Sequence, residues 1–360
     1  MTQQSQSLTQ TALKKLMRNK LALAGLVCII ISLFIAVFAY WLAPDPSPNA
    51  NRMILEISGQ SPGFTMQFLK LKKDHIPAGF LQRTISGKPD AYTYFPITGY
   101  KLNGDTIIVD HYVDEGITEK NSFPISAIDE SSFTDKKTFW LGTDKYGRDI
   151  LSRLIVGTRV SLSVGSIAVL ISLTLGILLG ALAGYYRGRS DDVIMWFINV
   201  VWSIPTLLLV FAITLVLGKG FWQVFIAVGL TLWVSVARMI RGQVFTIREL
   251  EYVEATKALG YSNFRTITRH ILPNVMGPVL VIGASNFATA IVIEAGLSFL
   301  GVGVQPPQPS WGLMIKENYN FIITNHPLLA ITPGLAIMIL VLSFNLLGNG
   351  LRDALDVRSN

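Results

Sequence analysis

Few side chains in this 360-residue chain could carry out covalent or metal chemistry. The one cysteine, Cys28, supplies neither a disulfide nor a Cys-based zinc or iron–sulfur site. His75 and His111 are isolated from other ligating residues, which is typical of surface or packing histidines. The sequence also lacks HExxH, GxSxG and the phosphate-binding pattern GxxxxGK followed by Ser or Thr. It therefore predicts no catalytic site, no metal site and no cofactor bound by this chain.

The most informative polar segment is the stretch 238–274, which separates two apolar runs. Residues 247–259 have helix-compatible spacing, with glutamates in the first turns where a helix dipole favours them. Gly260 can end this helix as its C-terminal cap. Ser262 can cap a second helix over 263–270, which should end near the proline that follows. The pattern predicts two short helices around a glycine turn, and periodicity alone leaves open whether they do more than pack.

The composition of the chain indicates a membrane protein. Hydrophobic residues make up 51% and charged residues only 15%, whereas a soluble chain has roughly a quarter charged residues. A helix needs roughly 20 apolar residues to cross a bilayer core of about 30 Å. Runs of suitable composition cover 21–42, 160–185, 193–217, 221–236, 275–299 and 328–347. We predict an all-α polytopic membrane protein with six transmembrane helices, the fourth extending into its flanking residues because its apolar run is short.

Two features of these runs bear on how the helices pack. Pro205 should bend the third helix, because proline frees a carbonyl one turn back. Small residues on the second helix would let it pack closely on a neighbour. These are Gly165, Gly176, Gly180 and Gly184.

The distribution of charge explains the net charge of +7. The segments 1–20, 187–192, 238–269 and 352–358 lie on one side of the membrane under this count, and they carry 14 basic and 7 acidic residues. The rest of the chain has 16 of each. All net positive charge therefore lies on one side, which the positive-inside rule assigns to the cytoplasm together with both termini. This bias accounts for the basic composition without a nucleic-acid partner.

Residues 43–153 form a separate polar region, which we predict to be a small extracytoplasmic domain that contains β-structure. Residues 92–95 and 106–112 alternate with period two, and Asn103-Gly104 between them is typical of a hairpin turn. The predicted organisation is a cytoplasmic N-terminal tail (1–20), a first transmembrane helix (21–42), this domain (43–153), a core of five transmembrane helices (154–351) that includes the loop 238–274, and a cytoplasmic C-terminal tail (352–360).

Residues 254–260, Glu-Ala-Thr-Lys-Ala-Leu-Gly, followed by His-Ile-Leu-Pro at 270–273, resemble the EAA signature of permease subunits in bacterial ABC importers. Thr256 replaces the second alanine of that signature, and His270 replaces an isoleucine. The segments 140–149 and 294–312 resemble blocks of the dipeptide and oligopeptide subfamily, in its C-type chains. The resemblance is close over 138–358 and loose over 1–45, and the region 43–153 is longer than this family usually has.

The resemblance implies a non-catalytic subunit of a type I importer in the bacterial inner membrane. Two permease chains would form the pathway, two ABC ATPase subunits would bind ATP and Mg, and an extracytoplasmic substrate-binding protein would deliver peptide. A moving ATPase can displace transmembrane helices only through a stiff protruding element, and a short braced helix meets that need. The residues implied in ATPase coupling are Glu254, Ala255, Thr256, Lys257, Ala258, Leu259, Gly260, Ile271, Leu272 and Pro273.

Other functions remain open from the sequence. An ion-gradient-driven secondary transporter would use Glu294, the charged residue that stands out within an apolar run, as its titrating group. A structural anchor would leave the function to the region 43–153. An importer of this type could also carry nickel chelates, glutathione or sugars in place of peptides.

Overall fold

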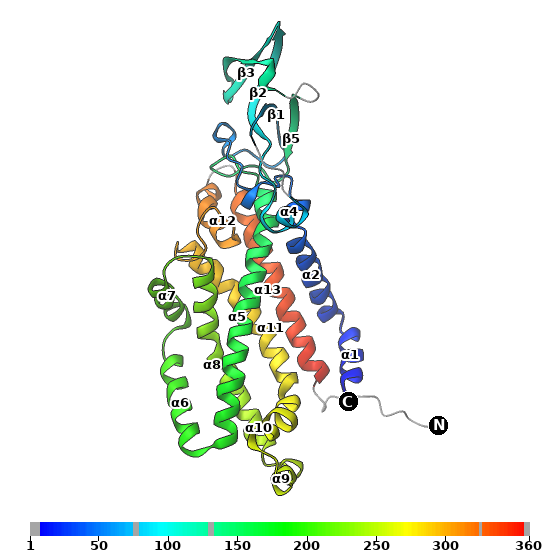
Figure 1. The fold of residues 1–360 in the computed structure, drawn as a ribbon, viewed down its shortest axis with the longest axis vertical. Helices are drawn as coiled ribbons and strands as arrows, with labels where there is room; N and C mark the ends of the chain where they lie inside the picture. The colour runs from blue at the N-terminus through cyan, green and yellow to red at the C-terminus, as the bar shows by residue number, and fades with distance from the viewer. Residues whose placement is uncertain (1–7, 75–78, 129–132, 324–325, 356–360) are drawn as a thin grey trace, which may run out of the picture. The chain divides into compact units, whose positions relative to one another are not determined.

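The computed structural model describes residues 8–74, 79–128, 133–323 and 326–355 (Figure 1). The chain divides into two compact units. The bundle unit combines the chain up to Ser32 with Ser161–Val304 and the chain from Ile337. The sheet unit combines Leu33–Val160 with Gln305–Ala336, so it contains the predicted domain 43–153 and a segment from much later in the sequence. His75 lies outside the described residues.

The helices account for most of the described chain. In order they are α1 (Leu8–Arg18), α2 (Lys20–Val37), α3 (Ala39–Leu42), α4 (Phe80–Ser86), α5 (Ile150–Tyr186), α6 (Gly188–Trp202), α7 (Thr206–Leu217), α8 (Phe221–Ile247), α9 (Glu251–Ala258), α10 (Asn263–Thr266), α11 (Leu272–Phe299), α12 (Trp311–Asn318) and α13 (Leu328–Leu355). Within the described residues, five helical segments are long and apolar enough to cross a membrane, or six if α6 and α7 form one broken span. The protein is therefore a mostly helical, multi-pass membrane protein.

The third apolar run differs from the single bent helix that the sequence predicts. It forms two helices, α6 and α7, whose axes differ by 91° at a break around Ser203 to Pro205 (Figure 1). Proline lacks the N–H that would continue the helical ladder and disfavours helical geometry in the residue before it. The bend at Pro205 is confirmed, but it is sharp enough to end one helix and begin another. The predicted extension of the fourth helix is also confirmed, because α8 continues to Ile247.

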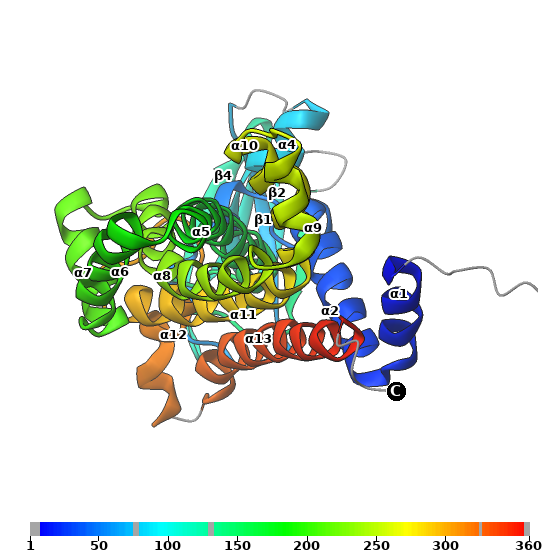
Figure 2. The same cartoon turned by 90° about the horizontal axis from the view of Figure 1, so that it is seen from below.

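Glycines on α5 bring its backbone close to neighbouring helices of the bundle unit. A Cβ atom at Gly180 would lie 2.5 Å from the carbonyl oxygen of Ala237, and one at Gly176 would lie 2.4 Å from the Cβ of Val236. Gly184 makes a similar approach to α8, and Gly165 faces a phenylalanine ring of α11. α8 thus packs beside both α5 and α11 (Figure 2). The predicted role of these four glycines in close packing is confirmed.

The sheet unit contains one antiparallel sheet of five strands in the order β4-β3-β2-β1-β5. The strands are β1 (Phe64–Lys72), β2 (Tyr92–Asn103), β3 (Thr106–Asp114), β4 (Ile117–Pro124) and β5 (Thr134–Phe139). The predicted hairpin is confirmed, since β2 and β3 pair up to Asn103 and Thr106 around Gly104, whose φ is +57°. The successive residues Phe68 and Leu69 are both fully buried, so both faces of the sheet are covered at that point.

A buried charge network holds α12 to the first turn of α5 within the sheet unit. Arg148 donates from Nε to Asp144 Oδ2 at 2.6 Å and from Nη2 to Glu317 Oε2 at 2.7 Å. Arg153 also donates to Glu317 Oε2, at 3.2 Å. These four side chains are almost completely buried, and their charges balance. The segment 140–149, singled out in the sequence, therefore supports the architecture of this unit.

Candidate functional site

The loop between α8 and α11 projects a short helix, α9, from one end of the bundle unit (Figure 1). α9 begins at Glu251, four residues after the predicted start, because α8 occupies the chain up to Ile247. At its C-terminus the N–H of Gly260 donates to the carbonyl of Lys257 and that of Tyr261 to the carbonyl of Thr256. This is the Schellman arrangement, and it requires the left-handed φ of +74° at Gly260. The predicted glycine cap is confirmed.

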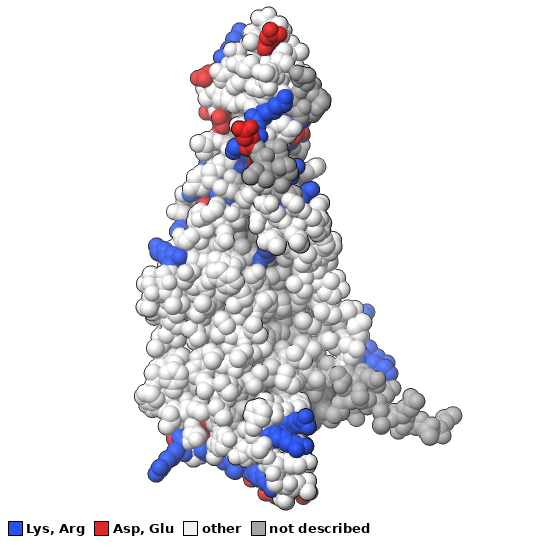
Figure 3. All heavy atoms as spheres, in the orientation of Figure 1, with Lys and Arg blue, Asp and Glu red and all other residues white. Residues whose placement is uncertain are grey.

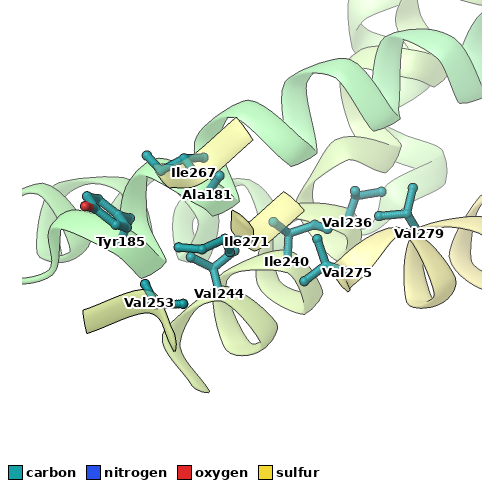
Figure 4. Packing of buried hydrophobic residues seen from close by; sticks show 10 residues of the cluster. All are labelled: Ala181, Tyr185, Val236, Ile240, Val244, Val253, Ile267, Ile271, Val275 and Val279. Atoms are coloured by element: carbon teal, nitrogen blue, oxygen red, sulfur yellow. The ribbon is translucent and has the colours of Figure 1, made fainter. Parts of the chain in front are cut away.

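α9 is held against the bundle through one fully buried side chain. Val253 lies among Tyr185 of α5, Val244 of α8 and Ile271 (Figure 4). The same cluster continues along α8 and α11. Its other members are Ala181, Val236, Ile240, Ile267, Val275 and Val279. A continuous apolar core therefore connects α9 to three long helices.

Hydrogen bonds reinforce this packing. The hydroxyl of Thr256 donates to the carbonyl of Val253 at 2.7 Å and lies 3.2 Å from the hydroxyl of Thr266 at the end of α10. Both threonines are buried. The hydroxyl of Tyr185 donates to Asn263 Oδ1 at 2.9 Å, and an Arg248 guanidinium nitrogen donates to the Tyr185 carbonyl at 2.5 Å. α9 and α10 are thus joined to each other and to α5 by polar contacts as well as by the apolar core.

The outer side of the loop is exposed and carries both apolar and charged residues. Leu259 and Phe264, on either side of the glycine turn, have 71% and 78% of their surface exposed. Glu254 and Lys257 are exposed on α9 beside them. Charged side chains gather at the end of the bundle unit where α9 lies (Figure 3). An exposed apolar turn with a charged rim has the composition of a protein-binding surface.

The ten residues predicted for coupling fall into two groups. Thr256 and Ile271 are buried, and Leu272 is half-buried. The exposed group comprises Glu254, Ala255, Lys257, Ala258, Leu259, Gly260 and Pro273. The first group can only support the loop, whereas the second is available to a partner. Sequence reasoning missed Phe264, which the spacing of a four-residue helix does not single out, and Val253, whose burial depends on three other helices.

The second helix of the loop differs from its prediction. Ser262 caps α10 as expected, accepting a hydrogen bond from the N–H of Arg265 at 3.4 Å. The chain does not stop near Pro273 but passes through a π-helical turn, Ile267–Ile271, directly into α11. The N–H of Leu272 donates to the carbonyl of Ile267, five residues back. This wider turn lets a helix continue past a proline at its first turn, where the missing N–H is not needed.

Polar side chains also fix the π-helical turn. Asn274 donates from Nδ2 to the carbonyl of His270 at 2.7 Å and to the hydroxyl of Tyr252 at 3.1 Å. The hydroxyl of Tyr252 is neutral at physiological pH, as is usual for tyrosine, and burial raises its pKa further. Tyr252 thereby links α9 to the start of α11, a connection that periodicity does not reveal.

Glu294 and His111, the other residues considered for a chemical role, make packing and hydrogen-bonding contacts within the fold. Glu294 is fully buried in α11 and accepts a hydrogen bond from the Ser298 hydroxyl at 2.6 Å. His111 stacks on Phe95 with ring centroids 4.0 Å apart, which confirms its interpretation as a packing histidine. Among the described residues, no group of three or more His, Cys, Asp or Glu side chains could hold a metal ion.

Comparison with known proteins identifies the family. Residues 176–360 match the family described as binding-protein-dependent transport system inner membrane component. Residues 7–58 match the N-terminal TM domain of oligopeptide transport permease C. An inward-facing structure of the MetNI methionine ABC transporter aligns with 57% of this chain and 97% of its own chain, with 17% identity and a TM-score of 0.47.

Curated relatives support the same assignment. The glutathione transport system permease protein GsiD of Pectobacterium atrosepticum is 42% identical over 218 residues, which are 60% of this chain and 72% of the relative. The dipeptide transport system permease protein DppC of Bacillus subtilis is 39% identical over 64% of this chain and 72% of its own length. The oligopeptide transport system permease protein OppC of the same organism is 40% identical, over 61% and 72% respectively. The chain therefore belongs to the family of binding-protein-dependent transport inner membrane components and is a permease of the ABC peptide-transporter type.

Proposed function

We propose that this chain forms half of the translocation pathway of an ATP-driven importer and that α9 is its coupling helix. The observation that carries the proposal is the two-sided character of the loop. Leu259 and Phe264 are presented outward, while Val253 on the opposite side of α9 is fully buried in the bundle unit. A partner that binds the exposed turn would pull on a helix that cannot move independently of the core.

The route from this surface to the pathway is the buried cluster around Val253. That cluster contains residues of α5, α8 and α11, so a displacement of α9 is passed to three membrane-spanning helices at once. Packed cores transmit displacement because they have low compressibility. Thr256 and Ile271 contribute to this transmission and not to partner recognition, since both are buried.

The partners follow from the family. A second permease chain completes the pathway, two ABC ATPase subunits bind ATP and Mg, and a binding protein delivers the cargo, while this chain itself is non-catalytic. We propose the six-span arrangement of a type I importer, with α6 and α7 together as one crossing. Both termini and α9 lie in the cytoplasm, in keeping with the positive charge of the segments 1–20 and 238–269.

The proposed cargo is a short peptide. Relatives named for dipeptide and oligopeptide transport support this class. Relatives named for glutathione transport make glutathione the alternative cargo.

The exposed turn can be tested without disturbing the core. Leu259→Asp and Phe264→Asp each place a charge where an apolar contact is expected, which costs at least about 2 kcal/mol at the centre of an interface. Because both side chains are mostly exposed, insertion and folding should be unchanged. We expect uptake in proteoliposomes with all partners to fall at least tenfold, together with loss of co-purified ATPase. Leu102→Asp, at an exposed site on β2, is the matched control and should transport normally.

Two results would contradict this proposal. Wild-type uptake and ATPase binding by both loop variants would show that the turn around Gly260 is not the coupling surface. Uptake driven by an ion gradient in vesicles without ATPase subunits would instead favour a secondary transporter, with Glu294 as the first residue to examine.

A further inference from the structure

Helix α4 in the sheet unit shows the reverse of the pattern expected for a helix in water. Phe80, Leu81 and Ile85 have 68%, 72% and 63% of their surface exposed, and no residue of α4 is buried. Its half-buried residues are the polar Arg83 and Thr84. A helix on a water-exposed domain directs its apolar side chains inward, so the outward apolar face of α4 needs a partner.

The polar side of α4 is fixed to the rest of the sheet unit. The Arg83 guanidinium lies over the Trp41 ring, 3.7 Å from its centroid, and Trp41 Nε1 donates to the hydroxyl of Thr84 at 3.2 Å. Arg159 donates to the carbonyls of Thr84 and Ile85 at the end of the helix, both at 3.0 Å. These contacts hold α4 in one orientation, with Leu81 and Ile85 directed away from the protein.

The apolar face of α4 adjoins the end of a membrane-spanning helix. α2 ends at Val37 and is followed at once by α3, whose Trp41 and Leu42 are 40% and 45% exposed. The rings of Trp41 and Phe80 are in contact, with centroids 5.5 Å apart. α2 has the length and hydropathy of a bilayer span, so its end marks the depth at which hydrocarbon gives way to headgroups. α4 lies against that boundary.

The residue types around α4 fit this depth. Tryptophan is enriched at the membrane interface because its ring is apolar and its N–H is polar. Arg83 places positive charge over the Trp41 ring, and Arg159 places positive charge at the end of α4. Lys88 is exposed just after the helix. Basic side chains at this level can contact lipid phosphates while neighbouring apolar side chains enter the acyl region.

We propose that α4 is a second membrane anchor, which inserts Phe80, Leu81 and Ile85 into the lipid surface next to the end of α2 and so fixes the sheet-containing domain to the bilayer. The occupant of this apolar face is lipid, because Phe80 contacts Trp41 just beyond the exposed apolar end of α2, a helix with the hydropathy of a bilayer span, and because tryptophan and arginine border the face. This anchor lies outside the loop that we propose for coupling, so it stands independently of that function.

Nitroxide accessibility in the full-length protein tests this proposal. Cys28, the one cysteine, is replaced by alanine, and a spin label is attached to Leu81→Cys in lipid nanodiscs. Phe34→Cys, on an exposed position of α2, is the lipid reference, and Leu102→Cys on β2 is the water reference. Collision with oxygen, which concentrates in lipid, is compared with collision with a water-soluble nickel chelate. Ile85→Cys repeats the measurement at a second position.

We expect the labels at positions 81 and 85 to resemble the label at 34, with oxygen collisions in excess of nickel collisions. A label that resembles position 102 would overturn the proposal, because it would place α4 in water. Labels at 81 and 85 that are shielded from both reagents, and only when the partner subunits are present, would also overturn it, because the face would then be covered by protein.

Discussion

The contact between Thr256 and Thr266 offers a sharp test of how α9 is braced. Thr256→Val keeps the shape of the side chain and leaves the exposed face of α9 unchanged. It removes the bond to the Val253 carbonyl at 2.7 Å and the contact with the Thr266 hydroxyl at 3.2 Å. Because Thr256 is buried, water cannot readily replace these contacts. The substitution should therefore loosen α9 from its support without altering what a partner touches.

The size of the effect follows from the two lost hydrogen bonds. Each contributes about 0.5–1.5 kcal/mol net, so the free energy of locally opening α9 should fall by about 1–3 kcal/mol. The equilibrium constant for local opening then rises about 5- to 150-fold, since about 1.4 kcal/mol corresponds to a factor of ten. In the double variant Thr256→Val with Thr266→Val the loss should be smaller than the sum of the single losses, because the two hydroxyls contact each other.

Hydrogen exchange on the reconstituted protein measures this opening. In the Thr256→Val variant we expect the amides of Val253 to Lys257 to exchange about 5- to 150-fold faster. ATPase subunits should still co-purify, and uptake should fall. Thr268→Val is the matched control, because that hydroxyl bonds within its own segment, to the Phe264 carbonyl at 2.8 Å. Unchanged protection of α9 in the Thr256 variant, or an equal loss in the Thr268 variant, would refute the proposed brace.

Two further predictions concern the rest of the fold. Gly180→Leu should separate α5 from α8, because a Cβ atom at position 180 would lie 2.5 Å from the Ala237 carbonyl oxygen. Size-exclusion profiles in detergent should show loss of folded protein. Gly242→Leu, at an open position, is the control and should not cause this loss. In the sheet unit, burial is the main cause that lowers the pKa of Lys137 from 10.5 to about 8, and repulsion by Arg52 is the second cause. Between these pH values the unfolded state binds more protons than the folded state. The free energy of unfolding should therefore rise from pH 8 towards 10. Lys137→Met should abolish that rise and stabilise β5 at pH 7 by at most about 3 kcal/mol. Hydrogen exchange, corrected for the intrinsic exchange rate at each pH, measures both effects. A rise that persists in the variant would show that Lys137 is not its cause.

Several features of this protein are local in origin, and the sequence alone determined them. The helix termination at Gly260, the cap at Ser262 and the hairpin turn at Gly104 depend on conformational preferences of a few adjacent residues. The apolar runs are equally local, because a helix in lipid must satisfy its own backbone hydrogen bonds within the segment. The family resemblance carried by residues 254–260 could also be recognised from the sequence, because the motif is one short contiguous segment.

Other boundaries depended on how neighbouring segments compete. Residues 247–250 have helical spacing, but α8 takes the chain as far as Ile247 and α9 begins only at Glu251. Pro273 looks like a helix end in the sequence, yet the π-helical turn at 267–271 carries the chain past it into α11. Pro205 predicts a bend but not its size, which is 91° between α6 and α7, two helices that both contact α8.

Which side chains of the loop are exposed depends on contacts between separate segments of the chain. Glu254 and Thr256 are two residues apart on one helix, but one is exposed and the other is buried. Thr266, at the end of α10 beyond the glycine turn, contacts Thr256 and covers that side of α9. The outward apolar face of α4 is likewise set by Trp41 and Arg159, from distant parts of the sequence, which contact its polar residues. Whether a side chain is buried depends on which other segments pack against it. The hydrophobic pattern of one segment shows only which of its side chains are apolar enough to be buried.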